Sequence, residues 1–140
     1  MFEICKRFVF SASHQLDGLP DGHQCARLHG HNYTVEIELS AARLNRHGFV
    51  VDFGDLAPIK QFLDTVFDHR HLNDVFKQLD YDFPTTSEHL AVFLADWCSR
   101  MYPSWPVTAV TVSETPATWA TYRFPQRAIL TFETGARPDD

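Results

Sequence analysis

Residues 2–14, FEICKRFVFSASH, carry the clearest structural pattern in the chain. Their even positions are mostly apolar, whereas Glu3, Arg7 and Ser11 stand at odd positions. This period of two is typical of a β-strand with one buried face. Residues 31–41, HNYTVEIELSA, repeat the pattern with the opposite parity. We therefore expect two long strands that pair as an antiparallel hairpin.

Two segments with helical spacing follow these strands. Asp55 is expected to cap a first helix, which has Pro58 in its first turn and apolar residues at helical intervals up to Phe67. Thr85 and Glu88 have the spacing of a capping box and predict the start of a second helix. An amphipathic helix buries its apolar stripe, so both helices are expected to pack against the sheet.

The C-terminal part returns to strand patterns. Val107–Thr115 alternates, and Thr118–Phe124 with Ala128–Glu133 predicts a closing strand that is interrupted at Pro125. The order ββααββ predicts an α+β fold, a four-stranded antiparallel sheet with two helices on one face. We expect a single domain over residues 1–134 and a polar tail over residues 135–140.

Composition excludes several classes of protein. The 140 residues carry 12 basic and 18 acidic side chains, a net charge of −6, so binding to nucleic acid or to an anionic membrane is not expected. The longest apolar run, Leu90–Ala95, is far shorter than the roughly 18 residues that span a bilayer. Charged residues near the N-terminus argue against a secretory signal. The 3 cysteines include no C-x-x-C pair, which favours free thiols and a cytoplasmic location.

Long strands in an open sheet leave exposed edges that invite unwanted pairing. We expect edge-to-edge assembly of several copies to cover these edges. The polar face of the sheet would then line a solvent-filled centre.

Three of the 8 histidines are placed differently from the others. His14 ends the apolar face of the first strand, and His29 and His31 begin that of the second. In an antiparallel hairpin these ends meet, and residues two apart point to the same side. Three neutral imidazoles suit zinc and leave a coordination position for water or substrate, as in catalytic sites. The alternative is three ordinary half-buried histidines at a strand end.

Cys25 precedes His29 by four residues and has two possible roles. It could be a fourth metal ligand in a closed structural site, or a thiolate base beside the ion. Cys5 and Cys98 are interpreted as packing residues.

Two acidic side chains are further candidates. Asp68 stands next to His69, where the pair could transfer protons or could merely cap a helix end. Glu114 lies on the apolar side of its strand and needs a partner, either a ligand with N–H donors or an arginine. The remaining histidines are interpreted as surface or loop residues: His23, His47, His71 and His89.

Six motifs together resemble a known family. They are SASH (11–14), CARLHGHNY (25–33), VDFGDL (51–56), FDHRHLN (67–73), TTSEHLA (85–91) and SET (113–115). In order and spacing they are similar to the 6-pyruvoyltetrahydropterin and 6-carboxytetrahydropterin synthases, over about residues 8–122. The three-residue gap between Cys25 and His29 is similar to that of the bacterial 6-carboxytetrahydropterin synthases.

The resemblance implies a tunnelling fold with two stacked trimers and active sites at subunit boundaries. It implies that 7,8-dihydroneopterin triphosphate is converted to 6-carboxy-5,6,7,8-tetrahydropterin, acetaldehyde and triphosphate, on the route to 7-deazaguanine nucleosides such as queuosine. His14, His29 and His31 would hold zinc, and Cys25 would abstract a proton. Asp68 and His69 would transfer protons, and because the active sites lie at subunit boundaries the pair could serve the zinc site of a neighbouring chain. Glu114 would bind the pterin's N–H edge.

Three alternatives stay open at this point: a 6-pyruvoyltetrahydropterin synthase, a non-enzymatic zinc protein with Cys25 as fourth ligand, and a zinc hydrolase with Glu114 as base. Groups for the triphosphate are only candidates, namely Lys6, His23 and Arg27.

Overall fold

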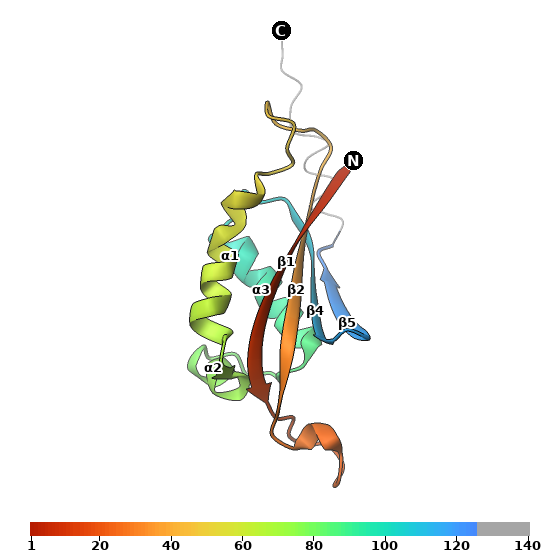
Figure 1. Ribbon diagram of the computed structural model, residues 1–140, viewed down its shortest axis with the longest axis vertical. Helices are drawn as coiled ribbons and strands as arrows, with labels where there is room; N and C mark the ends of the chain where they lie inside the picture. Colours follow the sequence, from red (N-terminus) through yellow and green to blue (C-terminus); the bar gives the residue numbers. More distant parts are fainter. Residues whose placement is uncertain (126–140) are drawn as a thin grey trace.

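The computed structural model describes residues 1–125, which build a five-stranded sheet (Figure 1). β1 (Phe2–His14) and β2 (His29–Ala41) pair antiparallel along their whole length. β4 (Val107–Thr115) joins β2, and β5 (Thr118–Arg123) joins β4, both antiparallel. The expected α+β class and the long N-terminal hairpin are therefore confirmed.

A fifth strand corrects the predicted sheet. β3 (Arg70–His71) runs parallel to β1, opposite Ala12 and Ser13, which gives a mixed sheet in the order β3-β1-β2-β4-β5. The prediction of four antiparallel strands was wrong here, because two residues are too few to show an alternating pattern. β3 pairs with β1 because the chain just before it is hydrogen-bonded to Ser11.

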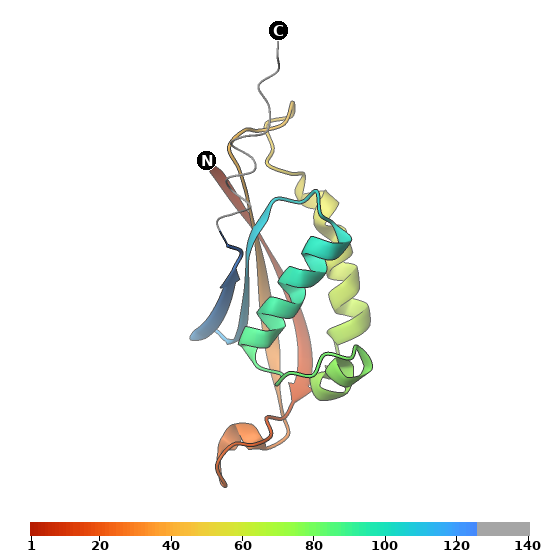
Figure 2. The same ribbon diagram turned by 180° about the vertical axis from the view of Figure 1, so that it is seen from behind.

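Three α-helices are present in residues 1–125 where two were expected: α1 (Ala57–Phe62), α2 (Leu72–Gln78) and α3 (Ser87–Met101). α1 and α3 cover one face of the sheet, and α2 lies at the end where β1 finishes (Figures 1 and 2). The expected first helix is not regular, since a 3₁₀ turn at Phe53–Leu56 precedes α1 and a π turn at Leu63–Phe67 follows it.

Both predicted helix caps were wrong by one to three residues. Asp52, and not Asp55, caps the first helical segment, because its carboxylate accepts a hydrogen bond from the Gly54 N–H at 2.8 Å. Thr86, and not Thr85, caps α3, its hydroxyl accepting from the His89 N–H at 3.3 Å. Thr85 has other partners, which belong to the site described below.

The core lies between the sheet and its helices. From Phe8 onward in β1, and from Tyr33 to Leu39 in β2, every second side chain is buried, as the alternation predicted, whereas Phe2 at the start of β1 is exposed. The largest fully buried members of the core from the sheet are Tyr33, Val35, Ile37 and Leu39, and those from the helical segments are Leu56, Ile59, Leu63, Phe67, Leu72, Leu90 and Leu94.

The opposite face of the sheet is polar. Arg7 pairs with Glu36 at 2.8 Å and Arg123 with Glu38 at 3.0 Å. β3 covers only two residues of the outer edge of β1, and β5 is the last strand at the other edge of the described part. The open edges that motivated the assembly hypothesis are therefore present in residues 1–125.

None of the helices in residues 1–125 combines the length and apolarity that crossing a bilayer requires. The predicted strand Ala128–Glu133 and the predicted tail 135–140 lie outside the described residues.

Candidate metal centre and acid-base pair

His14, His29 and His31 converge at one end of the sheet. His14 is the last residue of β1 and lies opposite His29, the first residue of β2. One ring nitrogen from each histidine lies within 4.8 Å of the other two. Within residues 1–125, this is the single group of histidine, cysteine, aspartate or glutamate ligand atoms that meets so closely. The three histidines could form a metal site.

Backbone carbonyls orient two of the three rings. His14 Nδ1 lies 2.8 Å from the carbonyl oxygen of Thr85, and His29 Nδ1 lies 2.6 Å from that of Arg27. Because a carbonyl oxygen only accepts, both Nδ1 atoms carry a proton and donate it. In the neutral rings the two Nε2 atoms then direct lone pairs toward each other across 2.9 Å. A cation held by both nitrogens would turn this repulsion into attraction.

The environment favours the neutral form of the His14 and His31 imidazoles. Burial lowers the pKa of His14, and the nearby His29 and His31 act in the same direction, against the opposing effects of the Thr85 carbonyl and Glu114. Burial also lowers the pKa of His31. A neutral imidazole is the form that binds a metal ion.

Glu114, at the end of β4, faces the cluster. Its carboxylate oxygens lie 3.8 Å from His14 Nε2 and 3.7 Å from His31 Nε2. These distances exceed hydrogen-bond length, and His31 Nε2 is a buried atom without a hydrogen-bond partner in residues 1–125. Glu114 was expected to meet a ligand or an arginine; the groups that it faces in residues 1–125 are these histidines, at distances too long for hydrogen bonds. Three inward-facing nitrogens, one unpaired, beside a carboxylate fit a divalent cation such as zinc.

Asp68 and His69 form a pair in the turn before β3. Asp68 Oδ2 lies 2.8 Å from His69 Nδ1, and Asp68 Oδ1 accepts the Ser11 N–H at 2.8 Å. His69 has φ +56°, and its N–H donates to the Ser11 carbonyl at 2.6 Å. This left-handed turn lets both residues bond to Ser11, and strained turns of this kind often occur at functional sites.

Hydrogen bonds set the charge state of Asp68. The Ser11 N–H, and then the His69 ring, hold the pKa of Asp68 below its ordinary value. The carboxylate is therefore ionised and can fix the ring of His69. The His69 side chain is 81% exposed, so its ring is free to meet a ligand or another chain.

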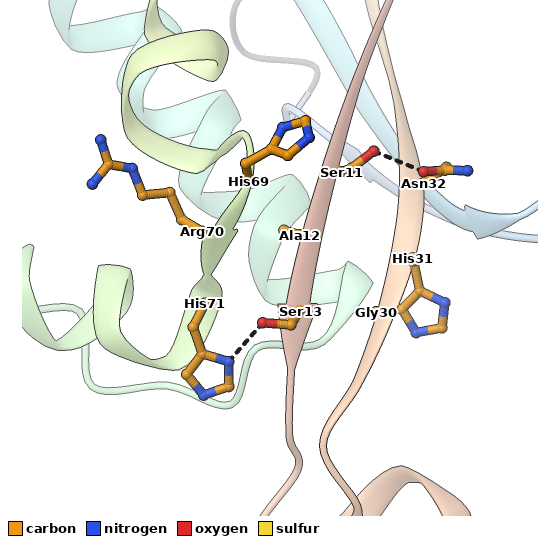
Figure 3. Close-up of a pocket in the computed structure, with 9 residues that line it drawn as sticks. All are labelled: Ser11, Ala12, Ser13, Gly30, His31, Asn32, His69, Arg70 and His71. Carbon is orange, nitrogen blue, oxygen red and sulfur yellow. Dashed lines mark hydrogen bonds between the residues drawn. The ribbon is translucent and has the colours of Figure 1, made fainter.

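An open groove of about 510 Å³ links the two groups (Figure 3). His31 and His69 both line it, and the other lining residues are Ser11, Ala12, Ser13, Gly30, Asn32, Arg70 and His71. His71, expected as a surface or loop residue, lies in β3 with its Nδ1 3.0 Å from Ser13 Oγ. Arg70 points away from β1 (Figure 3).

Cys25 stands apart from the histidine cluster. It lies in the 3₁₀ turn Gln24–Ala26, where its N–H donates to His23 Nδ1 at 3.1 Å. Among the described residues, its sulfur is not a member of the group of ligand atoms that meet within 4.8 Å. This arrangement favours a three-histidine site over a closed site with Cys25 as fourth ligand.

Three residues beside the site escaped the sequence-based search for functional groups: Asn73, Thr85 and Tyr33. Asn73 holds both backbone groups of Gln15, accepting its N–H at 3.0 Å and donating to its carbonyl at 2.7 Å. Thr85 is buried against His14. Tyr33 is buried beside the rings, and burial, followed by the charge of Glu114, raises its pKa above the ordinary value. All three carried a signal, since Asn73 lies in the motif FDHRHLN, Thr85 in TTSEHLA and Tyr33 in CARLHGHNY.

Comparisons with known proteins give one family. The family described as 6-pyruvoyl tetrahydropterin synthase matches residues 3–125. A 6-carboxy-5,6,7,8-tetrahydropterin synthase of Bacillus subtilis is 35% identical, covering 87% of this chain and 85% of that protein. A 6-pyruvoyl tetrahydrobiopterin synthase of Drosophila melanogaster is 33% identical, covering 87% and 79%. The solved Caenorhabditis elegans 6-pyruvoyl tetrahydropterin synthase superposes with a TM-score of 0.75 at 26% identity, covering 89% and 96%.

Proposed function

Because the chain belongs to the 6-pyruvoyl tetrahydropterin synthase family, we propose that it is a zinc-dependent 6-carboxy-5,6,7,8-tetrahydropterin synthase. Its substrate would be 7,8-dihydroneopterin triphosphate, and its products 6-carboxytetrahydropterin, acetaldehyde and triphosphate. The product would serve 7-deazaguanine synthesis, such as that of queuosine, in the cytoplasm. The names of several bacterial relatives and the three-residue spacing between Cys25 and His29 support the carboxy product.

One observation carries the proposal. Three histidine nitrogens from two paired strands meet beside Glu114, and backbone carbonyls fix two of the rings with their Nε2 atoms inward. Metal-binding histidines usually donate their second nitrogen to such carbonyls. With three protein ligands, a zinc ion keeps a position for substrate, which distinguishes a catalytic centre from a structural one.

Each residue has a separate task in this proposal. His14, His29 and His31 would hold zinc, which supplies Lewis acidity toward the hydroxyl oxygens of the substrate side chain. Cys25 would remove a proton from that side chain. Asp68 orients His69, which would return or relay protons, and Glu114 would bind the pterin ring's N–H edge and fix its orientation.

The open edges of the sheet support a homo-oligomer, and we propose a hexamer of two stacked trimers. Within residues 1–125, the outer edge of β1 is free except at Ser11, Ala12 and Ser13, and β5 can pair with the β1 edge of a neighbouring copy. Asp68 and His69 lie at that β1 edge. In such a ring His69 could serve either its own metal centre or that of the next subunit.

The deciding experiment is mass spectrometry of the products formed from 7,8-dihydroneopterin triphosphate, with elemental analysis of the purified protein. The expected result is 6-carboxytetrahydropterin with acetaldehyde, and zinc near one per chain. A 6-pyruvoyl product without acetaldehyde would instead indicate the 6-pyruvoyl synthase. Hydrolysis of simple esters or amides with no pterin turnover would refute the proposal in favour of a zinc hydrolase.

A further inference from the structure

Two buried side-chain atoms in residues 1–125 lack a hydrogen-bond partner, His31 Nε2 and the Tyr33 hydroxyl. The two residues are neighbours on the core face of β2. Buried polar groups are nearly always paired, because an unpaired one loses its hydration without compensation. Two such atoms at one place point to a shared ligand rather than to two separate defects. A metal ion accounts for the nitrogen but not for the hydroxyl, which needs an acceptor.

The Tyr33 ring is fixed in position. It lies opposite Phe10 in the β1–β2 ladder and stacks on that ring, with centroids 4.9 Å apart and planes 9° from parallel. Its other neighbours are the rings of His31 and His14, at 5.5 Å and 6.0 Å between centroids. The side chain is 0% exposed, so it cannot turn its hydroxyl out to water.

The hydroxyl is a hydrogen-bond donor at neutral pH, since a tyrosine ordinarily loses its proton only near pH 10. The acceptor must therefore be an atom with a free lone pair that enters the cluster. The Nε2 atoms of the three histidines would bind the cation, and the Nδ1 atoms of His14 and His29 donate to carbonyls. The nearby Glu114 carboxylate makes no hydrogen bond to the Tyr33 hydroxyl, so an oxygen of the bound ligand is the acceptor that remains.

We propose that the Tyr33 hydroxyl donates a hydrogen bond to the oxygen atom of the ligand held at the three-histidine centre, either water or a side-chain hydroxyl of the pterin substrate. This rests on the metal centre of the proposed function and adds a residue to it. Tyr33 thereby orients the ligand oxygen, and it favours hydroxyl and water ligands over ligands that offer no lone pair to a donor.

The test uses Tyr33→Phe, which keeps the stacked ring and removes one oxygen atom. Cobalt(II) is the probe, because its visible spectrum reports the ligand environment. We expect the spectrum of the Tyr33→Phe protein to shift relative to the wild type. We also expect cobalt to bind about 10-fold more weakly, as for other groups that support a metal site indirectly. The metal-free variant should be at least as stable as the wild type, since it no longer buries an unpaired hydroxyl.

Tyr81→Phe is the matched control. Tyr81 also packs among aromatic rings, but its hydroxyl has a partner, the His89 carbonyl at 3.4 Å. Loss of the Tyr81 hydroxyl should change the stability of the metal-free and cobalt-loaded proteins equally and leave the cobalt spectrum unchanged.

Two outcomes would overturn the inference in distinguishable ways. If Tyr33→Phe gives the wild-type cobalt spectrum and affinity, the role of Tyr33 is refuted while the metal centre stands. If the wild type itself binds no cobalt, the metal centre is refuted, and the inference with it. Neither readout needs pterin turnover, so a shifted spectrum supports the role of Tyr33 even if the product assay fails.

Discussion

Replacing Asn73 by alanine should weaken both the fold and the metal centre. Asn73 lies in the first turn of α2 and holds the backbone of Gln15 through two hydrogen bonds, at 3.0 Å and 2.7 Å. Gln15 directly follows the metal-ligand candidate His14. Removing the amide leaves the N–H and the carbonyl of Gln15 without these partners, and His14 loses the anchor on its C-terminal side.

The magnitude follows from those two bonds. Each intramolecular hydrogen bond contributes about 0.5–1.5 kcal/mol net, so the variant should lose about 1–3 kcal/mol of unfolding free energy. For a domain of this size, a loss in the middle of that range lowers Tm by about 5–10 °C. Misplacement of His14 should weaken zinc binding about 10-fold, as loss of other groups around metal ligands does. Thermal unfolding with chelator, and a zinc titration against a competing indicator, measure the two effects.

Asn45→Ala is a matched control at the opposite end of the sheet. The Asn45 side chain also makes two hydrogen bonds to the backbone, accepting the N–H of His47 at 2.9 Å and that of Phe49 at 3.0 Å, but in an exposed loop. Water can replace them there, so its loss should cost less stability and leave zinc affinity unchanged. Equal zinc affinity in the Asn73 and Asn45 variants would refute the argument that Asn73 positions His14.

Three further predictions test the site. Cys25→Ala should retain zinc by elemental analysis but abolish pterin turnover, whereas loss of zinc would support the four-ligand alternative. Chelator-treated protein should lose thermal stability as pH falls below about 6.5, because the lowered pKa values of His14 and His31 mean that the unfolded chain binds more protons. A Tm that stays constant from pH 8 to pH 5 would contradict this. The pKa of Asp68 in the folded chain is lower than its ordinary value of 3.8, so its carboxylate stabilises the fold above that pH. This stability is lost as pH falls through the lowered pKa, so Asp68→Asn should make Tm less dependent on pH in acid.

Features that depend on a repeated local pattern could be predicted from the sequence. β1 and β2 have 13 residues each, so the two-residue period repeats several times in both. These repeats show which face of each strand is turned toward the core. The same parity is enough to place His14, His29 and His31 on one face of the hairpin. The cluster follows because the hairpin register sets His14 opposite His29.

Features that depend on contacts between distant segments could not be predicted in this way. β3 has only two residues, and it is held beside β1 because the Ser11 N–H donates to the Asp68 carboxylate and the His69 N–H donates to the Ser11 carbonyl. Thr85 fits a capping box as a sequence, but its hydroxyl lies 3.2 Å from His14 Nδ1, and the next residue, Thr86, caps α3 instead. In both cases a tertiary partner outweighs the local preference.

The segment from Asp68 to Asn73 connects the Asp68–His69 pair to the histidine cluster, because it is attached to β1 at several points. It runs beside β1 and contacts it residue after residue. His69 is hydrogen-bonded to Ser11, and β3 pairs with the next two residues of β1. Asn73 is hydrogen-bonded to Gln15, which follows β1. The Asp68–His69 pair is thus attached at Ser11, about 10 Å along an extended strand from His14, the candidate metal ligand. A displacement of this segment that moved His69 would also pull on Gln15. The candidate metal centre and the Asp68–His69 pair are therefore coupled through β1.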